Sequence, residues 1–163
     1  MIESGVQWLL GVLAIPKVGL SSVFCISFIS ATLIPMGSEP AVFAVIEANP
    51  LLYWSVIAVA TLGNTLGGVV DYWLGYFAKT AIFPGLSGHW TARLQRIGPK
   101  SLLLAWVPGF GDPICTLAGW LKLPFWPSVL YMAIGKCARY MLMTVVLMAV
   151  PDGWWHLIGS WLP

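Results

Sequence analysis

Long apolar stretches, broken by short segments rich in glycine and proline, follow one another along this chain. Residues 18–34 carry no charge, and only residues 41–46 separate the break that follows them from the next polar segment. Two such stretches cannot both cross a membrane, because a spanning helix needs about twenty apolar residues. The pattern therefore predicts a re-entrant hairpin that turns at residues 35–40, followed by a membrane-crossing helix over residues 51–77.

A second copy of this pattern follows after a more polar connection. Residues 101–107 enter, residues 108–113 turn, residues 114–121 return, and residues 124–150 form a second crossing helix. A hairpin adds no net crossing and the helix after it adds one, so the two copies have opposite orientations. The pattern predicts an all-α integral membrane protein, built as an inverted repeat of a re-entrant hairpin plus a transmembrane helix.

The two predicted turns share a motif in which two prolines flank three residues and an acid. It reads Pro35-Met36-Gly37-Ser38-Glu39-Pro40 in one copy and Pro108-Gly109-Phe110-Gly111-Asp112-Pro113 in the other. Each copy is followed by an aromatic pair, Tyr53-Trp54 or Phe125-Trp126, and then by a glycine with a polar residue, Gly63-Asn64 or Gly135-Lys136. Breaks at matching positions of two apolar halves point to a transport site near the bilayer midplane.

We expect a single membrane domain over residues 1–163, with a first repeat at about 18–78, a linker at 79–100 and a second repeat at about 101–150. The linker holds four of the eight basic residues, so the positive-inside rule places it in the cytoplasm and both chain ends outside. Its spacing of apolar and basic residues fits a short helix on an anionic leaflet, and a solvated linker is the alternative.

Composition supports a membrane location and excludes other classes of function. Apolar residues make up 59% of the chain and charged residues 9%, far from the proportions of soluble proteins. A net charge of +2 without a basic run gives no sign of nucleic acid. The three cysteines lack metal-ligand or disulfide spacing, and neither histidine has a nucleophile beside it. We therefore expect no enzyme activity, metal or cofactor.

The two predicted turns imply an internal polar site, because lipid cannot satisfy the backbone groups of a turn. Each returning helix directs its amino terminus at this site, where Ser38 or Glu39 and then Asp112 are placed to cap it. Capping alone is the alternative role of the two acids. The candidate substrate contacts in the turns are Gly37, Ser38, Gly109 and Gly111.

Charged residues inside the apolar helices are the other candidates for function, since each is costly at membrane depth. Lys136 and Arg139 share one face of the second crossing helix and suit the phosphate of a lipid headgroup. Three deep acids, Glu39, Asp71 and Asp112, accompany these two bases. The acid in excess tends to hold a proton, so all three are candidates for proton coupling, with Glu39 favoured.

Taken together, these motifs resemble the DedA superfamily, also called the SNARE-associated or VTT-domain family, and are most similar to its small bacterial YqaA branch. The resemblance covers about residues 21–148 and rests on the first turn, the glycine-rich residues 63–68, the second turn and residues 135–140. It implies re-entrant hairpins in an inverted repeat, a multi-pass location in the bacterial inner membrane, and proton-dependent translocation of phospholipid or undecaprenyl phosphate by a flippase or scramblase. Glu39 falls on the hairpin glutamate of that family, whereas Asp112 stands where many relatives have arginine.

Two other classes of function remain open at this point. A proton-coupled transporter or channel for a small solute would use the same hairpins without a lateral opening to lipid. A membrane assembly protein would use the deep charges as contacts between helices. The expected partners are membrane lipids and protons, and the pattern is also compatible with a homo-oligomer.

Overall fold

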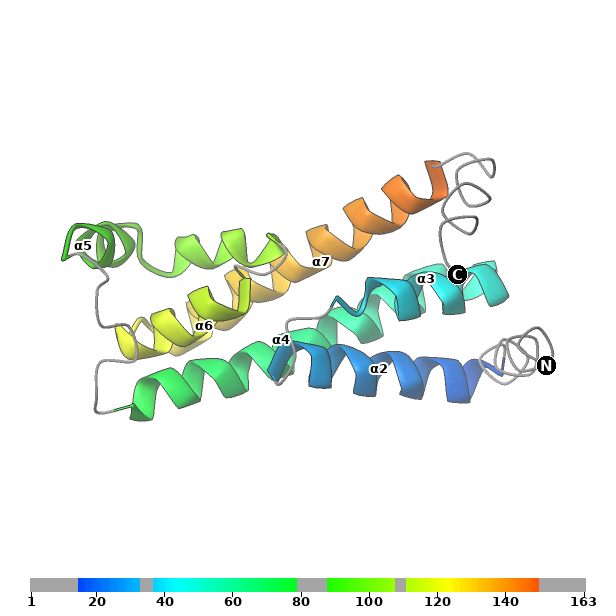
Figure 1. Cartoon of the computed structure of the whole chain (residues 1–163), viewed down its shortest axis with the longest axis horizontal. Helices are drawn as coiled ribbons and strands as arrows, with labels where there is room; N and C mark the ends of the chain where they lie inside the picture. The colour runs from blue at the N-terminus through cyan, green and yellow to red at the C-terminus, as the bar shows by residue number, and fades with distance from the viewer. Residues whose placement is uncertain (1–14, 33–36, 79–87, 108–110, 150–163) are drawn as a thin grey trace, which may run out of the picture.

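A computed structural model describes residues 15–32, 37–78, 88–107 and 111–149. For residues 88–91 and 147 it describes the backbone but not the side chains. Within these ranges the chain is helical and has no β-strand, which confirms the all-α prediction (Figure 1). The predicted turns lie partly outside the described residues, as do the first part of the linker and both chain ends.

The first half of the described chain begins with α2 (Pro16–Thr32) and α3 (Glu39–Ala48). Helix α3 starts at the acid of the first motif, and Pro40 occupies the first turn, where its missing N–H is no loss. A short 3-10 turn, η1 (Pro50–Leu52), then leads into the long helix α4 (Tyr53–Phe77).

The second half contains α5 (Gly88–Ile97), η2 (Gly98–Trp106), α6 (Gly111–Trp120) and α7 (Phe125–Ala149). The linker therefore contains a helix, as its residue pattern predicts. The entering segment differs from expectation: it begins at Gly98 instead of residue 101 and is a 3-10 helix. Gly98 takes a φ of 65°, which glycine adopts without strain, and Pro99 follows it, so the α5 helix cannot continue.

The second and third α-helices of each half match in length and in starting point. Helices α3 and α6 each have 10 residues and carry the motif acid in the first turn. Helices α4 and α7 each have 25 residues and begin at the aromatic pair. Figure 1 shows α2 and α3 in the right half of the molecule, η2 and α6 in the left half, and α4 and α7 running along its length.

Two apolar clusters lie along this length and leave a polar layer between them. The first joins α2, α3 and α4 and includes the ring of Tyr140 from α7. The second joins η2, α6, α7 and the later part of α4, and includes Cys115 and Met132. The buried polar side chains described in the next section lie where α7 passes from one cluster to the other.

Glycines allow α6 to lie directly against α4. A side chain at Gly119 would collide with the carbonyl oxygen of Tyr72, and one at Gly75 would collide with the carbonyl oxygen of Thr116. The two backbones therefore meet without intervening side chains. This close approach fixes the later part of α6, from Thr116 to Gly119, relative to α4.

Two described helical segments are long and apolar enough to cross a bilayer, Pro50–Phe77 and Phe125–Val146. Their outer surfaces carry exposed large apolar side chains, including Leu62 and Leu74 on α4 and Leu130 and Val145 on α7. Exposed tryptophans lie at or near helix ends, as in the aromatic belts of membrane proteins. These features fit a membrane protein.

Candidate functional site

The candidate site is a set of buried polar side chains gathered around the middle of α7. Lys136, Arg139 and Tyr140 come from this helix, and all three are buried. They meet the first turns of α3 and α6 and the middle of α4. The structure thus brings together charged residues that are about 100 positions apart in the sequence.

The first ion pair joins α7 to the start of α3. The Arg139 Nε donates a hydrogen bond of 2.6 Å to Glu39 Oε1, and one of its terminal nitrogens donates to the same oxygen. The two side chains are 10% and 15% exposed. An acid in the first turn of α3 also fits the partial positive charge of a helix amino terminus. Glu39 is thus held by two favourable interactions.

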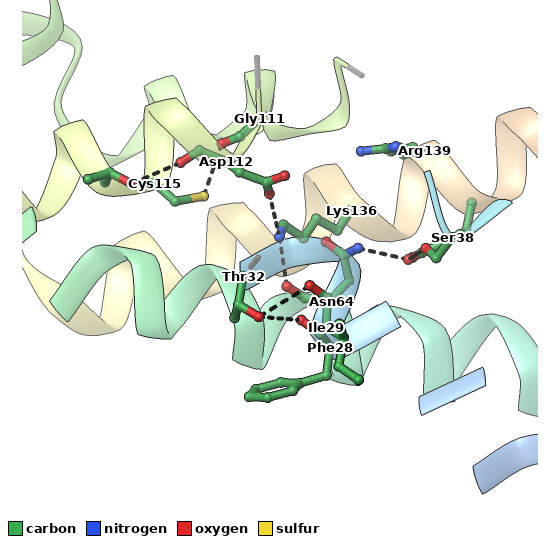
Figure 2. A network of polar contacts seen from close by, with 12 residues as sticks. Phe28, Ile29, Thr32, Ser38, Asn64, Gly111, Asp112, Cys115, Lys136 and Arg139 are labelled. Atoms are coloured by element: carbon green, nitrogen blue, oxygen red, sulfur yellow. Dashed lines mark hydrogen bonds and ion pairs between the residues drawn. The ribbon is translucent and has the colours of Figure 1, made fainter. Parts of the chain in front are cut away.

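The second ion pair joins α7 to the start of α6. The Lys136 ammonium donates to Asp112 Oδ1 at 3.3 Å and to the backbone carbonyl of Asn64 at 2.7 Å (Figure 2). Lys136 is 1% exposed, whereas Asp112 is 27% exposed. Asp112 is therefore directed at a base on another helix, a role beyond the capping of its own helix.

The hydroxyl group of Tyr140 joins two residues that neighbour the ion pairs, Ser38 beside Glu39 and Asn64 beside Lys136. This hydroxyl accepts a hydrogen bond of 2.9 Å from the Asn64 side-chain amide and lies 2.6 Å from the hydroxyl of Ser38. Ser38 occupies the N-cap position of α3, yet its side chain makes no capping hydrogen bond. Ser38 thus stands at the cap position, one of the two residues expected there, but its buried hydroxyl pairs with Tyr140 and not with the backbone of α3.

Asp71 lies on α4 beside the second ion pair. Its side chain is buried, and its Oδ2 atom has no hydrogen-bond partner among the described residues. Asp112 and Lys136 are both close enough to act on it electrostatically. Among the described residues it forms no ion pair, so it is the acid left in excess when Glu39 and Asp112 are paired.

The glycines expected to contact substrate have different surroundings. Gly37 is exposed and lies against the Glu39 side chain, where a larger residue would collide with the carboxylate. Gly111 is buried, and a side chain there would come within 2.5 Å of the carbonyl oxygen of Ala105, so it serves the packing of α6 on η2. Gly109 lies outside the described residues.

Sequence reasoning did not select Tyr140 or Asn64 as site residues. Asn64 stands at the same distance from the start of α4 as Lys136 from the start of α7, and the Asn64 carbonyl accepts the lysine's hydrogen bond. The sequence signal for Asn64 is the repeated glycine-polar pair, in which Asn64 matches Lys136. Tyr140 follows Arg139 directly, but an aromatic residue in an apolar helix gives no sign that its hydroxyl is buried against polar partners.

This arrangement suits the reversible binding of an anion. A guanidinium and an ammonium one helical turn apart are good partners for phosphate oxygens, and each is now occupied by a carboxylate that another anion could replace. Among the described residues no group of three or more histidine, cysteine or acidic side chains could hold a metal ion. The bases are therefore the groups in this site best suited to bind a ligand.

Comparisons with known proteins give two named relatives. The chain is 37% identical over 142 residues to the inner membrane protein YqaA of Escherichia coli (strain K12), covering 84% of this chain and 96% of that protein. The protein of the same name from Shigella flexneri matches equally well. An uncharacterized protein of Haemophilus influenzae is 35% identical over 130 residues, covering 74% of this chain and 82% of its own length. No family model and no solved structure matches the chain.

Proposed function

Because the chain belongs to the family of the inner membrane protein YqaA, we propose that it works in the bacterial inner membrane and carries the anionic headgroup of a lipid across the bilayer. The substrate class is a lipid phosphate, either a phospholipid or undecaprenyl phosphate. The observation that carries this proposal is the burial of Lys136 and Arg139 one turn apart in a helix long enough to span the membrane.

Energetics favour a functional reading of these two bases. A charged side chain near the bilayer midplane costs at least about 2.5–3.5 kcal/mol. Buried ion pairs can often be replaced by apolar residues without loss of stability, so helix packing alone gives little reason to keep two of them. A lipid phosphate, in contrast, requires both the positive charge and the multiple N–H donors that Lys136 and Arg139 supply.

The proposal includes a membrane arrangement for the short helices. In it α3 and α6 are the returning arms of two re-entrant hairpins, related as an inverted repeat, and the chain is a member of the DedA superfamily. Their first turns then lie at membrane depth, where each presents an acid to α7. An opening toward lipid beside α7 would let the acyl chains stay in the bilayer while the headgroup crosses.

Exchange of anions on the two bases gives the proposed mechanism. The lipid phosphate replaces the carboxylates of Glu39 and Asp112 on Arg139 and Lys136. A carboxylate that loses its base in a low-dielectric site takes up a proton, because an unpaired buried charge is unfavourable. Glu39, Asp71 and Asp112 are the candidate proton carriers, and once the headgroup has left, the carboxyl groups give up their protons and return to the bases.

A lipid-flipping assay in liposomes tests this proposal. Wild-type protein should move fluorescent phosphatidylglycerol between leaflets, and Lys136→Gln/Arg139→Gln should abolish movement while remaining folded and inserted. Lys17→Gln/Lys100→Gln is the matched control, since it removes two exposed bases. Flipping retained in the first double variant would assign Lys136 and Arg139 to structure.

A role in membrane assembly is the second candidate, because both deep bases already have carboxylate partners in the structure. In that case the ion pairs join α3 and α6 to α7 and no lipid moves. A flux measurement with soluble ions in the same liposomes distinguishes lipid translocation and membrane assembly from a small-solute channel. Such a channel would pass solute without flipping lipid.

A further inference from the structure

We propose that Asp71 is a second carboxylate partner for Lys136, which takes over the ammonium when Asp112 and the start of α6 move away from α7. This inference deepens the proposed function, because it names the residue that keeps Lys136 paired while the site exchanges anions. It rests on three observations around one ammonium group.

The first observation is that Asp112 holds Lys136 loosely. The distance between Lys136 Nζ and Asp112 Oδ1 is 3.3 Å, longer than the roughly 2.7–2.9 Å of a strong charged hydrogen bond. Asp112 is also partly exposed, whereas Lys136 is enclosed. The firmer contact of the ammonium is the 2.7 Å hydrogen bond to the Asn64 carbonyl on α4. Lys136 is thus anchored to α4, and its contact with α6 is the weaker one.

The second observation is that Asp71 is buried with one carboxylate oxygen unpaired among the described residues. Its Oδ2 atom makes no hydrogen bond among the described residues, although a buried carboxylate is normally paired. Lys136 attracts its negative charge and Asp112 repels it. An acid without an ion-pair partner among the described residues and a loosely paired acid therefore both lie near one ammonium.

The third observation is a path between the two positions. Asn64, Gly68 and Asp71 follow one another along one face of α4, at helical spacing. A side chain at Gly68 would lie 3.0 Å from Lys136 Nζ, so the ammonium rests over this glycine. Asp71 is one turn further, a rise of about 4.5 Å, which rotations within the four-carbon lysine chain can cover. Glycine at position 68 leaves room for the ammonium beside the sulfur atoms of Met132 and Cys115, which also lie close to this position.

The physical consequence is that Lys136 always has a counter-charge. Removal of one member of a buried ion pair is strongly destabilising because it leaves an uncompensated charge. If two carboxylates can pair with the same ammonium, the loss of either one has little effect on stability. Only the loss of both leaves the ammonium uncompensated and destabilises the protein. The inference therefore predicts that Asp71 and Asp112 contribute to stability in a coupled way. Independent structural roles of the two residues would give no such coupling.

Thermal unfolding of the full-length protein in detergent tests the coupling. Asp71→Asn and Asp112→Asn should each shift the unfolding midpoint little. The double variant should lower it by more than the sum of the single shifts. Adding Lys136→Met to the double variant should restore the midpoint, because the unpaired ammonium is then gone. If the double variant does not fold, recovery of a folded protein by Lys136→Met supports the inference equally.

Two comparisons make the test specific. Asp71→Glu/Asp112→Asn keeps one carboxylate on α4 and should unfold near the midpoint of Asp112→Asn alone. Asp71→Asn/Glu39→Gln combines sites that serve different bases and should give additive shifts. The inference would be overturned if the midpoint shifts of Asp71→Asn and Asp112→Asn were additive in the double variant. It would also be overturned if adding Lys136→Met did not restore the unfolding midpoint.

The transport role of Asp71 has its own measurement. Asp71→Asn should slow lipid flipping while leaving the binding of phosphatidylglycerol vesicles to the protein unchanged, because the bases remain. Unchanged flipping would overturn this part of the inference. If the wild-type protein flips no lipid, the proposed function fails, whereas the thermal experiment still decides whether Asp71 pairs with Lys136.

Discussion

At the scale of single residues, the sequence indicates which side chains matter but not how they pair. The spacing of Lys136 and Arg139 predicts that both lie on one helical face, and the structure places both toward buried partners. The choice of Glu39 for Arg139 and Asp112 for Lys136 could not be predicted, because it depends on where the two short helices begin relative to α7. The role of Tyr140 depends on the same tertiary contacts.

The first prediction concerns the hydroxyl of Tyr140. Tyr140→Phe leaves the Ser38 hydroxyl and the Asn64 amide without their shared buried partner. We expect the free energy of unfolding to fall by about 1–3 kcal/mol, the usual cost of unsatisfied buried polar groups. Chemical denaturation in detergent measures it. Tyr131→Phe on the same helix is the control, and an equal loss in both variants would contradict the connecting role of Tyr140.

The second prediction concerns Glu39. A neutral Glu39 side chain would release Arg139 for phosphate, and Glu39→Gln imitates that neutral state permanently. We expect this variant to bind anionic lipid and to flip it at a rate that no longer responds to an imposed pH gradient. Flipping rates at several gradients provide the measurement. If the variant keeps the pH response of the wild type, proton coupling belongs to another acid, and Asp71 is then the next candidate.

At the scale of helices, apolar runs and proline-glycine breaks predict the main elements well. Helices α4 and α7 begin at the aromatic pairs that mark the repeat, and α5 forms within the basic linker. The 3-10 conformation of η2 was not predicted, because apolar periodicity does not separate a 3-10 from an α-helix over so few residues. Contacts between helices depend on glycines whose partners are distant in sequence.

The third prediction tests the contact between α4 and α6. Gly119→Ala places a methyl group against the carbonyl oxygen of Tyr72, so α6 must shift. We expect a loss of about 1–3 kcal/mol in the free energy of unfolding, as for other overpacked sites. The same denaturation experiment measures it. Ala58→Ser adds one atom at an exposed position of α4 and should change little, whereas equal effects would argue against a close contact.

At the scale of the whole molecule, the fourth prediction is the orientation of the chain. The positive-inside rule places α5 in the cytoplasm, and α4 then carries the chain from η1, where Leu51 is exposed, to the cytoplasmic side. Single cysteines at Leu51 and Gln95, in a background without the three native cysteines, should react with an impermeant reagent from opposite sides. Labelling from the same side would contradict the proposed crossing by α4.

The most direct test of the central claim compares lipid translocation with and without the two bases of α7, in variants that both lack the two motif acids. Glu39→Gln/Asp112→Asn keeps both bases, with Asp71 still available to Lys136. The second variant adds Lys136→Gln and Arg139→Gln. It therefore lacks both motif acids and both bases, and no member of either ion pair remains as an unpaired charge. Flipping of fluorescent phosphatidylglycerol in liposomes should continue in the first variant and stop in the second. Equal flipping by the two variants would contradict the claim that Lys136 and Arg139 carry the headgroup.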